Sequence, residues 1–459
     1  MSGPTHRWSR QEQNNLIADA MRFDQYEERV LFDQSILSFS SGQNSAFNTI
    51  PNVIDNGLRP NTFFLQGPAG TGKTFLYKVL CNYYRSKGDI FLCVASSGIA
   101  SLLLPGRSIA HSQFRIPIDC PDGTRCSINR QSPLAGLLKK TRLIIWDEVT
   151  MQLKHNFVAV DLTLRDIMQN QDDLFGGIPV VLGGDFAQIL PVVRRGRREN
   201  TANACIRFWD KWSIVRPLFL TQNMRVIEGE LNQRFADWLA KLSYTPSLYG
   251  PVELPDFIRV THDREEFREF VYPIQQIRTP ASSFFRERAI LSSRNDEVDK
   301  FNDNLSHLIG ANYHSYYSLD TTQNDQSRHV SDYTPEFLRT VSGQGLPPGK
   351  LTLHVGMPVM LLRNYYSREG LINGCRLIIT RLYNHCLKSR ITSADSRFDG
   401  NEHIISRINL SCDENLSFTL IRKQLPLRPC YAMTINKSQG QMLKYAGVDL
   451  ITPVFSHGQ

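Results

Sequence analysis

A glycine-rich turn with one lysine stands between an apolar segment at residues 63–65 and a helical pattern at residues 75–80. Backbone N–H groups of such a turn point inward at a helix N-terminus and bind phosphate. The sequence therefore predicts a nucleoside triphosphate site, in which Lys73 neutralises the β- and γ-phosphates and the Thr74 hydroxyl ligates Mg²⁺. The turn matches G-x-x-x-x-G-K-[ST] and consists of Gly67, Pro68, Ala69, Gly70, Thr71, Gly72, Lys73 and Thr74.

Two adjacent carboxylates, Asp147 and Glu148, follow a second apolar segment at residues 143–146. Open α/β sheets place ligand contacts at the carboxyl ends of their strands. There, Asp147 is expected to hold Mg²⁺ through a water and Glu148 to orient and deprotonate the attacking water. Together with the phosphate-binding turn, the pair indicates hydrolysis and not binding alone.

A third apolar segment, at residues 179–182, ends in Gly-Gly-Asp-Phe-Ala and then Gln188. A neutral amide at this position could contact the γ-phosphate and respond to its loss. The alternative is a Gly-Gly turn followed by a surface glutamine. Further along, Arg225 follows another apolar segment and could stabilise charge on the γ-phosphate from a second domain.

Composition sets limits on the class of protein. The 459 residues exceed what one hydrophobic core usually serves, so two or three domains are expected. The formal charge of +8 and the pI near 9.0 suit a polyanionic partner without requiring one. The nine cysteines include no C-x-x-C pair, which fits neither a disulfide framework nor a zinc site and indicates a reducing compartment. Because no apolar run reaches 18 residues and the stretch Met1 to Arg10 is polar, neither a membrane span nor a secretory signal is expected.

The order of segments predicts an α/β fold with a change of pattern near the C-terminal end. Apolar strands and helical segments alternate until short alternating strands and turn residues take over. A stretch at residues 105–140 is rich in Pro, Gly and basic residues, and fits a wedge against a nucleic acid as well as a solvated loop. The predicted parts are a polar N-terminal arm (1–35), a first α/β domain (36–215), the first part of a second α/β domain (216–349), a small all-β insertion (350–425) and the remainder of the second domain (426–459).

Taken in order over residues 36–459, these motifs resemble those of a superfamily-one DNA helicase of the Pif-one-like group, most closely the branch encoded by Helitron transposons. The resemblance rests on G-P-A-G-T-G-K-T, S-S-G-I-A-S followed by H-S-x-F, I-I-W-D-E, G-G-D-F-x-Q-I-L-P-V-V, L-T-x-N-M-R and M-T-I-N-K-S-Q-G-Q. It implies two RecA-like P-loop domains with parallel sheets, and a small β-barrel inserted in the second. It further implies ATP and Mg²⁺ as cofactors, single-stranded and tailed duplex DNA as partners, and 5′-to-3′ unwinding with family roles in DNA repair, recombination and telomere maintenance.

The resemblance also implies roles for individual residues. An amide can pair with N6 and N7 of adenine, so Gln43 becomes the adenine-reading residue, although alone it fits a surface side chain. Gln188 becomes the γ-phosphate sensor, Arg225 becomes the finger from the second domain, and Gly440 joins the nucleotide contacts. The residues implied in DNA binding or in coupling DNA to the nucleotide are Ser97, His111, Phe114, Thr434, Asn436, Lys437 and Gln439.

The sequence departs from the family pattern in two places. Ala187 stands where relatives carry Arg or a bulky residue, and the sequence reaches Gln459 before a Y-V-A-L-S-R segment that supplies a further arginine. We therefore interpret the chain as C-terminally truncated and expect it to hydrolyse ATP slowly. We also expect an unpaired sheet edge at the apolar residues Val448, Leu450, Ile451 and Val454.

Two further interpretations remain open beside an active helicase. One is a truncated helicase remnant that binds ATP and single-stranded DNA but hydrolyses poorly. The other is a P-loop enzyme that phosphorylates a small molecule, which leaves the motifs after residue 216 without explanation. For the active helicase we expect a monomer in the nucleus, with the mitochondrion as the alternative compartment.

Two substitutions should separate binding from chemistry. Lys73→Ala should abolish hydrolysis, because it removes the flexible cation of the phosphate-binding turn. Glu148→Gln should preserve ATP binding, because only the base for the attacking water is lost. Binding of a fluorescent ATP analogue and release of phosphate, measured on both variants, check this. Hydrolysis by Glu148→Gln at the parent rate would show that Glu148 is not the general base.

Overall fold

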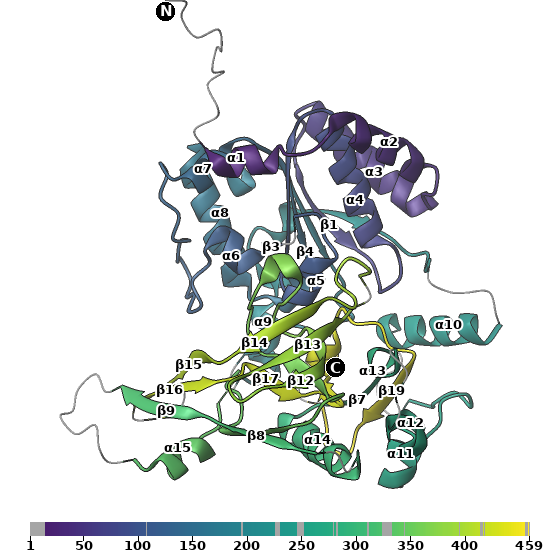
Figure 1. Ribbon diagram of the computed structural model, residues 1–459. Helices are drawn as coiled ribbons and strands as arrows, with labels where there is room; N and C mark the ends of the chain where they lie inside the picture. Colours follow the sequence, from purple (N-terminus) through teal and green to yellow (C-terminus); the bar gives the residue numbers. More distant parts are fainter. Residues whose placement is uncertain are drawn as a thin grey trace, which may run out of the picture. The chain divides into compact units, whose positions relative to one another are not determined.

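The computed structural model describes residues 14–106, 108–193, 196–224, 230–245, 252–278, 280, 283–309, 312–323, 333–343, 345–393, 395–413, 416, 418–454 and 458. They fall into two compact units, one covering residues up to 252 and the other residues 253–455 (Figure 1). No helix among these residues is long and apolar enough to cross a membrane. All nine cysteines are free thiols.

The first unit is built on a six-stranded sheet in which every neighbouring pair of strands is parallel (Figure 1). The glycine-rich turn follows one of the inner strands, where the carboxyl ends of its neighbours also lie. The predicted α/β fold with a parallel sheet is confirmed. In spatial order the strands are β3 (Ser108–Ile109), β2 (Ile90–Ala95), β4 (Thr141–Asp147), β5 (Val180–Gly184), β1 (Thr62–Gln66) and β6 (Arg216–Phe219).

Helices cover both faces of this sheet. Ile144 and Trp146 of β4 belong to one hydrophobic cluster and Leu143 and Ile145 to another, because successive side chains of a strand point to opposite faces. The first cluster is completed by α7 (Pro133–Lys139) and α8 (Lys154–Met168), and the second by α3 (Ser41–Asp55) and α4 (Lys73–Ser86). The unit also contains α5 (Gly98–Leu102), α6 (Ala110–Phe114), α9 (Arg198–Ala204), α10 (Glu230–Tyr244) and the 3-10 turns η1 (Val149–Met151), η2 (Leu174–Gly177), η3 (Ile206–Phe208) and η4 (Trp212–Ile214).

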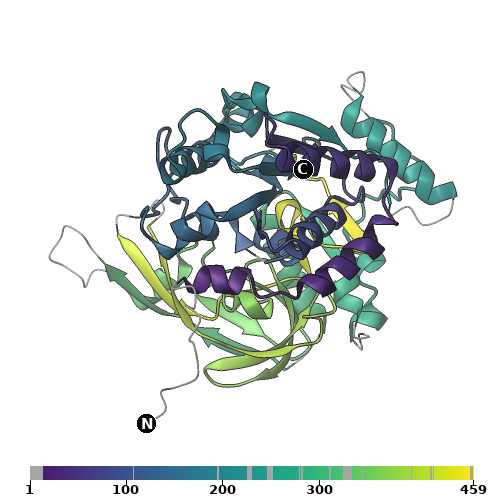
Figure 2. The ribbon, with the colours of Figure 1, turned by 90° about the horizontal axis from the view of Figure 1, so that it is seen from above.

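The N-terminal segment is not the surface arm that its polar composition suggested. The described part forms α1 (Asn15–Ala20) and α2 (Gln25–Ile36), which contact α7 and α4 respectively (Figure 2). Ile17 and Phe32 are buried, and Arg85 Nη1 lies 3.1 Å from Glu28 Oε1. A few apolar positions are enough to attach two short helices whose other faces remain polar, which explains why the sequence pattern was weak. Residues 1–13 lie outside the described residues.

The predicted boundary at residues 215–216 is wrong. The strand expected to open the second domain is β6, and it pairs in parallel with β1. The division between the two units falls at residues 252–253. Three residues of β6 are exposed and one is Pro217, so its sequence lacks the apolar run of a central strand. The local sequence of β6 does not specify which strand it pairs with, and only its pairing with β1 assigns it to the first sheet.

The second unit contains a three-stranded parallel sheet, in the order β18 (Ala432–Thr434), β7 (Arg288–Ser292) and β19 (Tyr445–Asp449). Among the described strands β19 pairs only with β7, and Val448, Leu450, Ile451 and Val454 are exposed. This agrees with the expected apolar edge. The helices of the unit are α11 (Arg264–Val271), α12 (Ile274–Arg278), α13 (Phe284–Glu287), α14 (Asn295–Ile309), α15 (Pro335–Thr340) and α16 (Ile435–Ser438).

A β-rich region occupies the middle of the second unit, and it begins before the predicted residue 350. Two strands at residues 314–323 pair with strands beyond residue 350, so they belong to the same region. A deletion of residues 350–425 would therefore remove the partners of both. One sheet of the region is a pair of strands, β10 (Lys350–Leu353) and β8 (His314–Tyr317). A five-stranded sheet has the order β14 (Glu402–Ser406), β13 (Cys386–Thr392), β12 (Arg376–Leu382), β11 (Pro358–Leu361) and β17 (Leu427–Pro429). A three-stranded sheet has the order β15 (Ile408–Cys412), β16 (Thr419–Gln424) and β9 (Leu319–Gln323). The 3-10 turn η5 (Ser367–Glu369) lies between β11 and β12.

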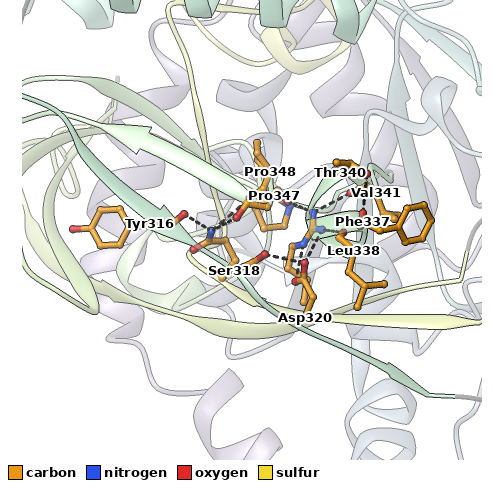
Figure 3. A network of polar contacts seen from close by, with 12 residues as sticks. Tyr316, Ser318, Asp320, Phe337, Leu338, Thr340, Val341, Pro347 and Pro348 are labelled. Carbon is orange, nitrogen blue, oxygen red and sulfur yellow. Dashed lines mark hydrogen bonds and ion pairs between the residues drawn. The ribbon is translucent and has the colours of Figure 1, made fainter. Parts of the chain in front are cut away.

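A buried ion pair joins three segments of the β-rich region (Figure 3). The side chains of Arg422 on β16 and Asp320 on β9 are 1% and 2% exposed. Arg422 Nε and Nη2 donate to the two carboxylate oxygens of Asp320, each at 3.0 Å. Its remaining bonds go to the carbonyls of Leu338, Val341 and Pro347, at 2.6, 3.0 and 3.0 Å. All five guanidinium donors are therefore satisfied, and α15 with the segment after it is fixed to both strands.

We predict that Arg422→Met destabilises the second unit by about 3–5 kcal/mol, because it leaves the Asp320 carboxylate buried without its partner. Arg422→Lys should also destabilise it, since an ammonium cannot make the bidentate contact. Calorimetric unfolding of the purified chain measures both. The control is Lys388→Met, which breaks the Lys388–Glu402 pair between side chains that are 39% and 40% exposed and should cost about 1 kcal/mol or less. Equal effects of Arg422→Met and Lys388→Met would contradict the prediction.

Candidate nucleotide site

The glycine-rich turn has the geometry of a phosphate-binding loop. Gly70 and Gly72 have φ of 91° and 81°, in the left-handed region that favours glycine. Helix α4 begins at Lys73, and the Leu76 N–H donates to the Gly72 carbonyl at 3.0 Å. The buried Lys73 curls over the loop, and its Nζ donates to the Gly67 carbonyl at 2.5 Å. The loop therefore places an ammonium group and the N-terminus of a helix of 14 residues at one point.

Gln43 lies directly against this loop. Its amide nitrogen is 3.3 Å from the Thr71 carbonyl and 3.5 Å from the Gly72 carbonyl, to which it donates. Its amide oxygen accepts the Ser40 N–H at 3.0 Å, which completes a capping box at the start of α3. The buried amide is thus engaged with protein groups at both ends, and adenine reading by Gln43 stays a prediction that requires these bonds to be exchanged. The Ser40-x-x-Gln43 spacing was the sequence signal for the cap.

The acidic pair lies at the carboxyl end of β4, as predicted. Burial raises the pKa of the Asp147 carboxyl, and the Lys73 ammonium opposes that shift. The Tyr77 hydroxyl donates to Asp147 Oδ1 at 3.1 Å. Glu148 has φ 55° and ψ 41°, an unfavourable conformation for a residue with a side chain. Such strain is concentrated at functional sites, and here it lies where β4 leads into the 3-10 turn η1.

Gln188 is held by a carboxylate that the sequence did not single out. The buried Asp185 accepts Gln66 Nε2 at 2.9 Å, the Ala187 N–H at 3.0 Å and Gln188 Nε2 at 3.3 Å. Gln66 is the last residue of β1 and immediately precedes the phosphate-binding loop. Asp185 therefore connects the loop strand to the predicted sensor. Ala187 contributes its backbone N–H, a contact that does not depend on its side chain.

The three residues predicted to contact DNA in the first unit have different environments. The ring of Phe114 is buried and lies 5.4 Å from the ring of Trp146 between centroids, so it belongs to the hydrophobic core and not to a DNA-contacting surface. The Ser97 hydroxyl caps α5 by accepting the Ala100 N–H at 3.3 Å. Burial lowers the pKa of His111, which favours its neutral form.

The other predicted coupling residues lie in the second unit, at the start of α16. Thr434 is the residue before the first turn of that helix. Lys437 Nζ donates to Asn373 Oδ1 at 3.0 Å, and burial lowers the pKa of Lys437, as do Arg363 and Arg428 to a smaller extent. Asn436, Gln439 and Gly440 belong to the same stretch. Arg225 lies outside the described residues, so its role stays a prediction.

The residues around Asp147 and Thr74 fit a nucleotide-bound magnesium ion. No group of three or more His, Cys, Asp or Glu that could hold a metal occurs in the described part of the chain. Mg²⁺ in nucleotide sites is held by one or two protein oxygens together with phosphate oxygens and waters. The buried Asp147 carboxylate and the half-buried Thr74 hydroxyl supply such oxygens at the phosphate-binding loop.

Known protein families match both units. Residues 38–245 match the sequence model of the PIF1-like helicases, and residues 336–382 match that of the 2B domain of DNA helicase Pif1. Residues 38–245 belong to the PIF1-like helicase family. Both matches agree with the predicted resemblance at this level, since together they cover the phosphate-binding loop, the acidic pair, Gln188 and part of the β-rich region.

Curated PIF1-like helicases are similar to the chain over most of its length. The ATP-dependent DNA helicase PIF1 of Mus musculus is 25% identical over 413 residues, which are 89% of this chain and 56% of the mouse protein. The ATP-dependent DNA helicase Pif1 of Bdellovibrio bacteriovorus is 26% identical over 390 residues, 84% of this chain and 78% of that protein. The chain thus spans little more than half the length of the mouse relative.

Solved structures of PIF1-like helicases share the fold. Bacteroides Pif1 bound to ssDNA superposes with a TM-score of 0.61 and 23% identity, covering 91% of this chain and 87% of that one. Pif1 helicase from Candida albicans gives a TM-score of 0.60 and 21% identity, covering 92% and 90%. At this level of identity the likeness shows the fold alone, and it agrees with the predicted class.

The contacts of Asp185 predict that it controls hydrolysis more than binding. Asp185→Asn replaces one of two buried acceptor oxygens with an NH₂ donor, so that either Gln188 or the Gln66 and Ala187 pair loses its acceptor, at a cost of about 1–3 kcal/mol. ATP hydrolysis should fall about tenfold or more, while affinity for a fluorescent ATP analogue should change little, because Lys73 and the loop N–H groups are untouched. Stopped-flow binding and steady-state hydrolysis measure the two quantities.

Gln188→Ala is the companion variant for Asp185→Asn. If Asp185 acts by holding Gln188, the double variant should be no slower than the slower single variant, because the two losses then describe one interaction. Fully additive losses, or an unchanged rate for Asp185→Asn, would contradict this role.

Proposed function

We propose that this chain is an ATP-dependent DNA helicase, in which DNA-stimulated ATP hydrolysis drives 5′-to-3′ translocation along single-stranded DNA. The observation that carries the proposal is the arrangement at the carboxyl edge of the first sheet. The phosphate-binding loop after β1, the acidic pair after β4 and the Asp185–Gln188 pair after β5 lie on three neighbouring strands. Phosphoryl transfer needs this combination of anion binding, a metal ligand, a base and a γ-phosphate contact.

Each residue has a defined task in the proposed hydrolysis. The N–H groups of Gly70 to Thr74 and the Lys73 ammonium hold the phosphates. Thr74 and Asp147 would hold Mg²⁺, which supplies charge neutralisation on the β- and γ-phosphates when bound. Glu148 takes the proton of the attacking water. Gln188, held by Asp185 at 3.3 Å, contacts the γ-phosphate.

Single-stranded and tailed duplex DNA are the proposed substrates. The formal charge of +8 supports a polyanionic partner. Solved relatives of this fold include Bacteroides Pif1 bound to ssDNA and two Pif1 helicases described as coordinating at forked dsDNA. The exposed Ile118 lies in the segment interpreted as a wedge, where a free apolar side chain suits separation of stacked bases. Polarity rests on the family resemblance.

Membership of the Helitron-encoded branch is also proposed, on the ordered set of motifs from G-P-A-G-T-G-K-T to M-T-I-N-K-S-Q-G-Q. The proposed family roles are DNA repair, recombination and telomere maintenance. The nucleus is the proposed compartment, with the mitochondrion as the alternative. A monomer is the proposed functional form, and sedimentation of the purified chain at several concentrations tests it.

The proposal predicts that single-stranded DNA stimulates ATP hydrolysis by the 459-residue chain. Log Kd for DNA should rise steeply with log salt, because phosphate contacts release counterions. A duplex with a 5′ single-stranded tail should be unwound and one with a 3′ tail should not. Coupled ATPase, fluorescence anisotropy and strand-separation assays measure these three quantities, with Lys73→Ala as the inactive control.

Each result has a distinct meaning for the proposed function. DNA binding without any salt dependence, or no binding at all, would exclude a DNA translocase. Binding of ATP and DNA with negligible hydrolysis would favour the helicase remnant over the active enzyme. Preferential unwinding of the 3′-tailed duplex would reverse the polarity.

A further inference from the structure

A tyrosine on the helix after the phosphate-binding loop reaches the predicted metal ligand. Tyr77 stands four positions after Lys73 on α4 and is fully buried. Its hydroxyl donates to Asp147 Oδ1 at 3.1 Å. Burial and the Asp147 charge raise the pKa of Tyr77 well above its ordinary value. A phenol O–H is a donor at neutral pH, so the geometry is that of a hydrogen bond donated to the carboxylate.

The first glycine of the Gly183–Gly184 pair makes room for this contact. A Cβ on Gly183 would lie 1.8 Å from Tyr77 Oη and 2.8 Å from Asp147 Oδ1. Since Trp146 of β4 is in register with Leu182 of β5, Gly183 stands beside Asp147 on the neighbouring strand. Three elements of the first unit, α4, β4 and β5, are thus fitted to each other around one hydrogen bond.

We propose that Tyr77 is a positioning residue for Asp147, which fixes the carboxylate in the orientation that serves the Mg²⁺ bound with ATP. A donor on one carboxylate oxygen restricts rotation of the group, so that the other oxygen is presented in one orientation. Partners of metal ligands commonly control metal affinity in this way. The inference rests on the proposed ATP hydrolase and deepens it, because it assigns a task to a residue outside the predicted motifs.

The same helix provides a matched control for a merely structural role. Tyr84 stands seven positions after Tyr77, two helical turns further on the same face. It too is fully buried, yet its hydroxyl has no hydrogen-bond partner among the described residues. Tyr77→Phe and Tyr84→Phe therefore each remove one buried hydroxyl from α4, and only the first touches Asp147.

The test measures Mg²⁺ affinity of the nucleotide complex on the full chain. Binding of N-methylanthraniloyl-ATP is followed during Mg²⁺ titration and in EDTA, with circular dichroism as the check on folding. Tyr77→Phe should move the Mg²⁺ midpoint about tenfold higher and leave affinity in EDTA unchanged. Tyr84→Phe should leave both quantities at the parent values. In an Asp147→Asn background, Tyr77→Phe should add no further change.

Several results would overturn the proposal. An unchanged Mg²⁺ midpoint for Tyr77→Phe, or an equal shift for Tyr84→Phe, would make Tyr77 a packing residue only. If Tyr77→Phe does not fold, Tyr77→Met is measured instead, and the same two outcomes decide. If Mg²⁺ enhances nucleotide binding by the parent chain and the variants have the same Mg²⁺ midpoint, only the positioning role is overturned. A parent chain that binds no nucleotide overturns both this inference and the proposed function.

Discussion

Burial of the Asp147 charge at the end of β4 is the constraint around which the first unit is organised. A carboxylate removed from water is costly unless opposite charge and hydrogen-bond donors compensate for it. Lys73 supplies opposite charge from the phosphate-binding loop, and the Tyr77 hydroxyl supplies a donor from the next turn of α4. The helix that binds phosphate is therefore also the helix that opposes the rise in the pKa of the predicted metal ligand, and β5 carries glycine at residue 183 to make room for the Tyr77 contact.

A second buried carboxylate extends this arrangement across the sheet. Asp185 bonds to Gln66 at the end of β1 and to Gln188 after β5. Gln43 joins α3 to the same loop through the carbonyls of Thr71 and Gly72. A change at any of these contacts would be transmitted to the loop through single hydrogen bonds. Buried polar groups linked in this way polarise one another, so the strength of one hydrogen bond depends on the others.

The β-rich region of the second unit depends on a different interaction. It consists of three small sheets with long intervening segments, which must be held together. Arg422 gathers five acceptors from β9, α15 and residues 341–347, which lie far apart in the sequence. The intact pair need add little net stability, but removal of one partner is costly because it leaves an uncompensated buried charge. The sequence of β16 alone does not predict this ion pair, because an arginine between two exposed or partly exposed residues is expected to be a surface side chain.

The sequence by itself determined the parallel sheet of the first unit and the placement of the glycine-rich turn, the acidic pair and Gln188 beyond its strands, because these depend on local patterns of apolar strands and turn residues. Only the tertiary structure decided that β6 belongs to the first sheet, that β8 and β9 belong to the β-rich region, and that Phe114 is a core residue. Strand partners and burial are set by contacts between distant segments. For the same reason the sequence did not predict roles for Tyr77, Asp185 and Gln66. Each of them contacts a partner at least 70 residues away in the sequence or on an adjacent strand.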